Sequence, residues 1–255
     1  MQLVPIPHRV QLFYSNDISD DQIILNDQEA IHCAKVLRKS VGDQLNILDG
    51  AGRRYTAIIT DLKKAKVTLS EVILVEESQD DRTKPSIAVG LLKNGTRMEW
   101  LIEKAVEIGV NEITLLNCKR SERSKVNMDR LRKIALSALK QSKQLWLPKL
   151  TGPIKMGQYL ESVTGSECVI AHYAPDHVDL YTISGVQSKT IIIGPEGDFT
   201  EDELGQALDA GCTPVNLGSS RLRTETAGLV ALTMMNNKMS VSNICLLYTS
   251  PSPRD

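Results

Sequence analysis

Two glycine-containing loops in the C-terminal half of the chain have residue types and a spacing that suit ligand binding. The first, Gly194-Pro195-Glu196-Gly197, directly follows the apolar run TIII. Glycines let a backbone approach a ligand closely, and ligands of open α/β sheets lie at the carboxyl ends of strands. The loop has neither the phosphate-binding nor the dinucleotide-binding glycine pattern. It therefore predicts contact with another kind of ligand, although a tight strand-to-helix turn without a ligand fits the spacing equally well.

The second loop joins the strand-like run VNLG to an apolar helix through the polar segment SSRLRTET. Arg221 and Arg223 precede the expected helix, where positive side chains oppose the helix dipole. Their presence indicates an anionic partner such as a phosphate or a carboxylate. Thr224 and Glu225 suit catalysis, and they suit equally well a cap and a negative charge at the first turn of the helix.

The other reactive residue types give little support to metal or covalent chemistry. Histidines and cysteines are dispersed, without a C-x-x-C pair or a zinc-ligand spacing. The sequence has no G-x-S-x-G turn and no recognisable Ser-His-Asp order. His172, in the segment CVIAHY, is expected to line the same site as the two loops, and no metal is expected.

The charge balance limits how this chain can bind nucleic acid. The chain has 30 Lys+Arg and 31 Asp+Glu and a formal net charge of -1, so an RNA-binding surface must be a local patch. Basic residues arranged as a track would neutralise phosphates, whereas singly each is an ordinary surface charge. The candidates are Arg9, Lys35, Arg38, Lys39, Arg53, Arg54, Lys93, Arg97, Lys140 and Lys143.

The N-terminal third predicts a small β-barrel over residues 1–78. Short runs rich in β-branched residues alternate with turn formers from His8 to about Val75. One helix over residues 27–40, with a narrow apolar face, interrupts them. The polar stretch EESQDDRTKP predicts a linker, with a domain boundary near residue 80.

Strands and helices alternate over residues 79–242, which predicts a largely parallel sheet covered by helices on both faces. Gly109 suits the left-handed end of one helix, Thr200 and Glu203 form a capping box for another, and Gly211 ends it. Residues 243–255 have no periodic pattern and indicate a disordered or non-native tail. No apolar run is long enough to cross a bilayer and the first residues do not resemble a secretory signal, so a cytoplasmic protein is expected.

The motifs together resemble those of a known enzyme family. GPEG after an apolar strand, followed by NLG and then LRTETAG, resembles the signature of the 16S rRNA uracil-N3 methyltransferases of the SPOUT class. HCAKVLRKSVGDQ with ILDG resembles their N-terminal segment, and KNGTRMEWLIEKAVEIGVNEI with KQS and LPKL resembles their middle. The resemblance runs from about His8 to about Met239.

This resemblance implies a PUA-like RNA-binding barrel, an α/β domain with a trefoil knot, S-adenosylmethionine as cofactor, and a homodimer acting on 16S rRNA or the small ribosomal subunit. Arg223 would stabilise charge on a uracil oxygen, and Glu225 would orient it or accept the N3 proton. The cofactor loops would contain Ile193, Gly194, Glu196, Gly197, Leu217, Gly218, Leu222 and Thr226. The RNA contacts would come from Arg9, Lys35, Arg38, Lys93, Arg97, Lys140 and Lys143.

Some positions depart from the family pattern. Asp198 stands where a further glycine is common, and Lys140 and Lys143 stand where Glu and Arg are common. The first arginine after Leu-Gly usually falls at the position of Ser220, whereas here it is Arg221, one residue later. Three functions other than N3 methylation stay open for this sequence: ribose 2'-O methylation by the same superfamily, a non-catalytic RNA-binding or ribosome-assembly role, and a phosphate-dependent metabolic enzyme. The absence of a phosphate-binding motif disfavours the last of these.

Overall fold

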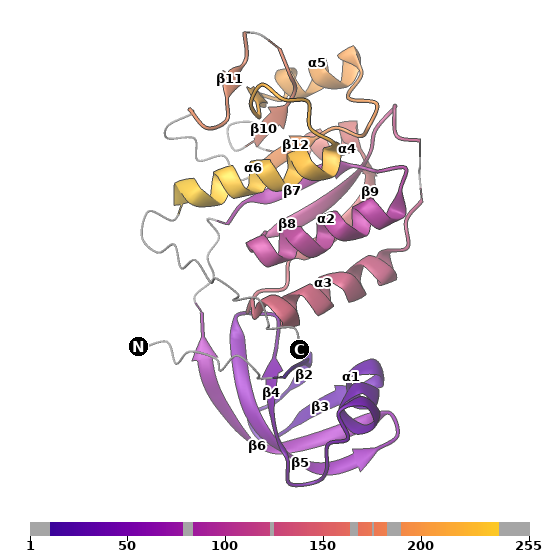
Figure 1. Ribbon diagram of the computed structural model, residues 1–255, viewed down its shortest axis with the longest axis vertical. Helices are drawn as coiled ribbons and strands as arrows, with labels where there is room; N and C mark the ends of the chain where they lie inside the picture. The colour runs from indigo at the N-terminus through magenta and orange to yellow at the C-terminus, as the bar shows by residue number, and fades with distance from the viewer. Residues whose placement is uncertain are drawn as a thin grey trace, which may run out of the picture.

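The computed structural model describes residues 11–78, 84–122, 125–163, 168–174, 176–182 and 190–239. It arranges them as two bodies, a curled sheet with its helical segment and a larger layer of strands between helices (Figure 1). Arg9, the boundary expected near residue 80 and the tail over 243–255 lie outside the described residues. Within the described part of the chain, no helix is long and apolar enough to cross a membrane.

The N-terminal body is a six-stranded sheet in the order β1-β4-β5-β6-β3-β2. β1 pairs with β4 in parallel, and the other neighbours are antiparallel. Its inner face buries an apolar cluster that includes Phe13, Ile47 and Leu69, as the alternating sequence pattern predicted. The strands are β1 (Leu12–Tyr14), β2 (Asp17–Ile18), β3 (Ile23–Asn26), β4 (Gln44–Leu48), β5 (Arg53–Lys63) and β6 (Lys66–Glu77).

The helix expected over residues 27–40 is shorter than predicted. It consists of α1 (Asp27–Ile31) and a π-helical segment, η1 (His32–Val36). The Leu37 N–H donates to the His32 carbonyl oxygen at 3.0 Å, and Arg38 then takes a left-handed φ of 51°. A left-handed residue cannot continue a right-handed helix, so the segment ends here.

The C-terminal body has a seven-stranded sheet in the order β11-β13-β10-β12-β7-β8-β9, and all neighbouring strands are parallel. The predicted parallel sheet is therefore confirmed. Three of its elements, β9, α4 and β11, were not predicted. The strands are β7 (Ser86–Gly90), β8 (Glu112–Asn117), β9 (Lys149–Lys155), β10 (Cys168–Ala171), β11 (Val178–Asp179), β12 (Thr190–Ile193) and β13 (Thr213–Asn216).

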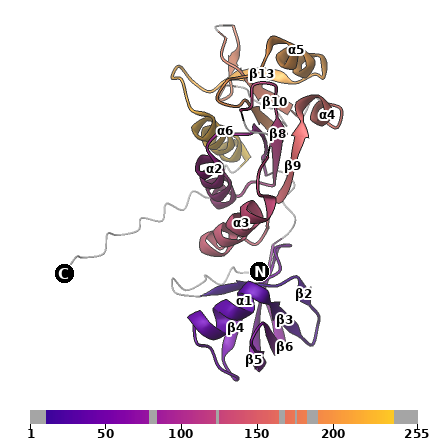
Figure 2. The same ribbon diagram turned by 90° about the vertical axis from the view of Figure 1, so that its right-hand side faces the viewer.

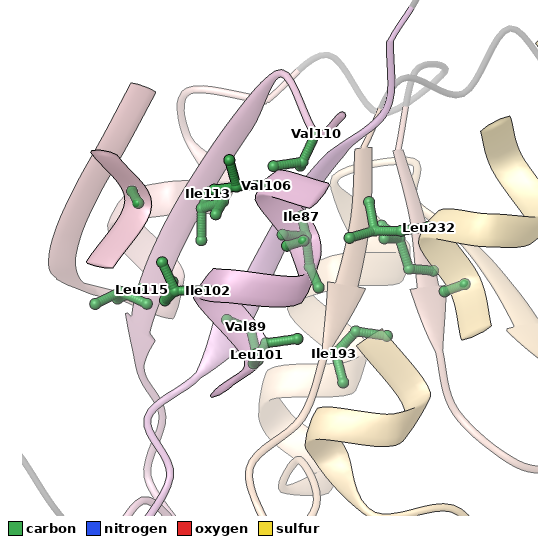
Figure 3. Close-up of a cluster of buried hydrophobic side chains, with 14 of the residues drawn as sticks. Ile87, Val89, Leu101, Ile102, Val106, Val110, Ile113, Leu115, Ile193 and Leu232 are labelled. Atoms are coloured by element: carbon green, nitrogen blue, oxygen red, sulfur yellow. The ribbon is translucent and has the colours of Figure 1, made fainter. Parts of the chain in front are cut away.

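Helices cover both faces of this sheet (Figure 2). α2 (Gly95–Ile108), α3 (Met128–Ser142) and α6 (Thr224–Met239) lie on one face, and α4 (Met156–Leu160) and α5 (Glu201–Asp209) lie on the other. Strand residues alternate between the faces. Ile87 and Val89 pack with Leu101 on one side (Figure 3), and Ala88 packs on the other.

The predicted helix ends are confirmed. Gly109 ends α2 with a φ of 87°, and Thr200 and Glu203 form a complete capping box on α5. The resemblance also implied a trefoil knot. α6 packs against β7 and β12, but part of the connection from β10 to β12, residues 183–189, lies outside the described residues.

The two bodies are joined by backbone hydrogen bonds and a shared apolar cluster. The Gly52 N–H donates to the Leu145 carbonyl oxygen at 3.1 Å, and the Leu147 N–H donates to the Gly50 carbonyl oxygen at 2.9 Å. A Cβ on Gly52 would lie 2.4 Å from the Trp146 ring, so this approach requires glycine. Leu12 and Leu48, both from the N-terminal sheet, belong to the same buried cluster as α3.

An ion pair with little solvent exposure lies at this junction. The Lys140 side chain of α3 contacts one carboxylate oxygen of Glu29, and the backbone N–H of Tyr14 donates to the other at 3.0 Å. The two charged side chains are only 19% and 14% exposed. Lys140, expected as an RNA contact, is therefore engaged by a carboxylate between the two bodies.

Replacing Glu29 with alanine should lower the free energy of unfolding by about 3 kcal/mol, because it leaves a poorly solvated ammonium and a backbone N–H without their partner. Urea denaturation measures this. The control is Asp61→Ala, which removes the exposed partner of Lys63 and should change stability little. Equal, small effects of both substitutions would show that the junction does not depend on the ion pair.

Candidate functional site

Three neighbouring strands bring the predicted loops to one edge of the sheet. β10 lies between β12 and β13, with Ala171 opposite both Ile193 and Val215. Because all three strands are parallel, their carboxyl ends meet at the same edge. Segments that are far apart in the sequence therefore converge there.

A cavity of about 680 Å³ lies at this edge. Its volume is typical of sites for small molecules and cofactors. The two glycine loops and the end of β10 contribute most of its walls, so the structure brings together the two loops that the sequence singled out. The lining residues are Ala171, His172, Tyr173, Ile193, Gly194, Pro195, Glu196, Asp198, Val215, Leu217, Gly218, Ser219, Ser220, Arg221, Leu222, Arg223, Thr224 and Ala227.

The first loop packs tightly against the end of β7. A Cβ on Gly90 would lie 2.5 Å from the backbone nitrogen of Pro195, so a side chain there would displace the loop. The Glu196 carboxylate accepts the Lys93 N–H at 3.1 and 3.3 Å. These contacts fix the position of the loop relative to the sheet.

The other side of the first loop is held by Arg120. Its Nη1 donates to the carbonyl oxygens of Gly197 at 3.2 Å and Phe199 at 2.9 Å. Gly197 itself does not line the cavity but faces Arg120, whose Cβ would lie 3.1 Å from a Cβ at that position. Among the predicted cofactor residues, Gly197 and Thr226 are the two outside the cavity lining.

The second loop begins with Gly218, which has a φ of 105° and open space where a Cβ would lie. Its requirement for glycine is therefore conformational and not steric. Arg221 and Arg223 are both exposed and line the cavity just before α6. Within the described part of the chain, neither forms an ion pair.

Glu225 lies away from the cavity lining. It is 7% exposed in the first turn of α6, and its Oε1 lies 3.6 Å from Nε of Arg97 on α2. Its Oε2 is buried and has no hydrogen-bond partner among the described residues. The family resemblance implied that Glu225 acts together with Arg223 on the uracil, whereas the structure places the Glu225 carboxylate beside Arg97.

Asn216, at the end of β13, was not predicted as a site residue. It holds in place the segment after β10, which forms the third side of the cavity. Its side-chain amide donates to the carbonyl oxygens of Ala174 at 2.8 Å and His177 at 2.9 Å, and its oxygen accepts the Ala174 N–H at 3.2 Å. These bonds hold the segment after β10 against the end of β13. The sequence feature that pointed to Asn216 is the run VNLG, because it ends a predicted strand at the same edge of the sheet.

His172 lines the cavity as expected. Its Nδ1 is buried, has no hydrogen-bond partner among the described residues, and lies 3.7 Å from Oδ2 of Asp198. Asp198 has a left-handed φ of 62°, which is uncommon for residues other than glycine. Its Oδ1 accepts the Phe199 N–H at 2.8 Å.

The predicted RNA-contacting residues have different surroundings. Lys35 and Arg38 are exposed on and beside η1. The Lys93 ammonium pairs with Glu122 at 2.6 Å, where both side chains are exposed. Lys143 ends α3 in a left-handed conformation with a φ of 58°.

The four described cysteines are free and buried. Burial raises the pKa of Cys33 to about 11 and that of Cys118 to about 12. Thiols with such values carry little thiolate at neutral pH, which disfavours them as nucleophiles. Among the described residues, no cluster of His, Cys, Asp and Glu could hold a metal ion.

Comparison with known proteins assigns both parts of the chain. Residues 79–236 match the RNA methyltransferase domain family, and residues 25–72 match the RNA methyltransferase PUA domain family. The ribosomal RNA small subunit methyltransferase E of Rickettsia conorii is 30% identical over 220 residues, which cover 84% of this chain and 88% of that protein.

Solved structures give the same assignment. A probable rRNA-methyltransferase from Porphyromonas gingivalis has a TM-score of 0.77 and 36% identity, covering 90% of this chain and 98% of its own. The ribosomal RNA small subunit methyltransferase E of Neisseria gonorrhoeae, bound to S-adenosyl methionine, has a TM-score of 0.75 and 26% identity, with coverage of 90% and 98%. The chain therefore belongs to the ribosomal RNA small subunit methyltransferase E family of SPOUT RNA methyltransferases.

Proposed function

We propose that this chain transfers a methyl group from S-adenosylmethionine to N3 of a uridine in 16S rRNA. The observation that carries the proposal is the cavity of about 680 Å³ built from both glycine loops, with two arginines free of ion pairs in the described structure at its wall. Family membership adds the cofactor, since the Neisseria gonorrhoeae relative is bound to S-adenosyl methionine.

The cavity fits the cofactor in size and in chemistry. Ile193, Leu217 and Leu222 contribute apolar side chains to the wall, which suit an adenine ring. Gly194 and Gly218 permit close approach of the backbone, whose polar groups suit the amino acid end of the cofactor. When bound, S-adenosylmethionine supplies a methyl group on a positively charged sulfur.

Three further residues are proposed to hold the cofactor loops in place. Glu196 closes the first loop by accepting the Lys93 N–H, and Gly197 permits the close approach of Arg120. Thr226 is exposed in the first turns of α6. It would act from the helix side of the second loop, and not from the cavity wall.

Arg223 is proposed to stabilise the uracil during transfer. The N3 atom must lose a proton as its lone pair attacks the methyl carbon, and negative charge then develops on the uracil oxygens. A guanidinium at the cavity wall stabilises such charge without forming a covalent bond. Glu225, which lies beside Arg97, would position the start of α6.

The substrate is proposed to be an unpaired or flipped-out uridine, because N3 lies on the base-pairing edge. Lys35, Arg38, Lys93 and Arg97 would contact phosphates of the surrounding rRNA. A homodimer with the site near the subunit boundary is proposed from the family resemblance. A cytoplasmic location is proposed because the substrate is ribosomal RNA. Residues 1–78 and 79–242 are proposed as the RNA-binding and catalytic domains.

Incubation with labelled S-adenosylmethionine and unmethylated small ribosomal subunits tests the reaction. The label should appear in 3-methyluridine after digestion of the rRNA, as identified by the mass of the nucleoside. Label in a 2'-O-methylated nucleoside would instead support the ribose-modifying activity. No label, despite cofactor binding by calorimetry, would contradict the proposed activity on this substrate.

Gly90→Ala should raise the Kd for S-adenosylmethionine by at least about tenfold, equivalent to about 1.4 kcal/mol. The added Cβ would overlap the Pro195 backbone and displace the first loop. Calorimetric titration measures the Kd. The matched control is Gly205→Ala on α5, where an added Cβ meets nothing within 4 Å. An unchanged Kd for a folded Gly90→Ala protein would contradict the assignment of the first loop.

Arg223→Ala should lower kcat by about 100-fold, the order found when one group that stabilises a developing negative charge is removed. The Kd for S-adenosylmethionine should stay unchanged, because the guanidinium acts on the uracil. Arg132→Ala is the control, since Arg132 pairs with Asp129 on the exposed face of α3. Normal turnover of the Arg223→Ala protein would remove this role.

A further inference from the structure

The reaction needs a proton acceptor, and three side chains that line the cavity are of a type that can act as a general base: His172, Glu196 and Asp198. Glu196 already accepts the Lys93 N–H with both carboxylate oxygens. Asp198 accepts the Phe199 N–H with Oδ1. His172 is therefore the candidate that remains for the proton acceptor. Histidine is the residue type whose protonation ordinarily changes between pH 5 and 8.

The geometry around His172 is that of an oriented base. Its backbone is held by the Val215 carbonyl oxygen, which accepts the His172 N–H at 3.1 Å, and by Nδ1 of His177, which lies 2.9 Å from the His172 carbonyl oxygen. The ring is 26% exposed at the cavity. Its Nδ1 is buried without a partner in the described structure and faces Oδ2 of Asp198 at 3.7 Å.

Asp198 has a backbone conformation that favours glycine, yet it carries a carboxylate. Its φ is 62°, and strained residues of this kind cluster at functional sites. Because Oδ1 accepts the Phe199 N–H, the other carboxylate oxygen, Oδ2, is the one nearer to the His172 imidazole. Hydrogen bonds of catalytic bases are often long before the substrate binds. A proton on Nδ1 would then leave the lone pair of Nε2 free to accept another.

Building on the proposed function, we infer that His172, oriented by Asp198, accepts the N3 proton of the target uridine. The N3–H proton moves to Nε2 of His172 as the N3 lone pair forms a bond to the methyl carbon. The bond from that carbon to sulfur breaks, and its electron pair stays on sulfur. The acidic and basic side chains that line the same cavity as His172 are Glu196 and Asp198 from the loop after β12, and Arg221 and Arg223 from the loop after β13. The ring of His177, from the segment after β10, lies 5.7 Å from the His172 ring.

The test compares His172→Gln with the wild type in single turnovers at saturating S-adenosylmethionine. Small subunits are reconstituted with 16S rRNA that contains either uridine or 5-fluorouridine. Loss of a general base should slow methylation of uridine by about 100-fold. Fluorine makes N3–H more acidic, so with 5-fluorouridine the defect should shrink by about tenfold or more, because proton transfer then depends less on a base.

Asp198→Asn is the second variant, because asparagine retains an oxygen for the Phe199 N–H and tolerates a left-handed backbone. It should show a smaller defect that 5-fluorouridine also reduces. A readout without turnover is the nitrogen NMR spectrum of the His172 ring, where the proton should lie on Nδ1 in the wild type and redistribute to Nε2 in Asp198→Asn.

Each outcome separates the inference from the proposed function. A wild type that forms no 3-methyluridine contradicts the proposed function itself. A wild type that forms it, while His172→Gln is equally slow on both RNAs, contradicts the role of His172 alone. Normal rates for His172→Gln on uridine would do the same.

Discussion

The parallel pairing of β10 between β12 and β13 is the constraint on which the site depends. Each strand ends at the same edge, so the loops that follow Ala171, Ile193 and Asn216 are forced into one cavity. None of these loops encloses the space alone. Asn216 adds a second constraint, because its amide ties the segment after β10 to the end of β13. The geometry of the cavity is thus a property of the sheet and follows from its strand order.

Much of the fold was predictable from the sequence because its signals are local. The capping box of Thr200 and Glu203 and the left-handed Gly109 are set by neighbours within one helical turn. β9 was missed for a physical reason, since it contains Gly152-Pro153, a pair that usually interrupts strands. Here Gly152 has a φ of 104° and lies against the Leu115 carbonyl oxygen, at an irregularity in the pairing of β8 with β9.

The candidate site also has features that the sequence predicted and features that it did not. The glycine loops were predictable because they rest on backbone conformation and close approach, which restrict residue type at single positions. The approach of His172 to Asp198 and that of Glu225 to Arg97 were not, since they arise only when β10 meets β12 and α6 meets α2. Residues with charged or aromatic side chains give no local sign of such a partner. Strand order, which sequence periodicity does not contain, decides it.

The basic residues show how a chain of net charge -1 can still meet an anionic partner. Lys93 pairs with Glu122 where both side chains are exposed, so exchanging that carboxylate for a phosphate costs little. Lys140 cannot exchange its partner in this way. If it left Glu29, a carboxylate that is 14% exposed would stay between the two bodies without its charged partner. Under the proposed function, the same residue type therefore serves RNA binding at Lys93 and the junction of the two bodies at Lys140. Burial of the partner carboxylate, more than the position of the lysine in the sequence, separates the two roles.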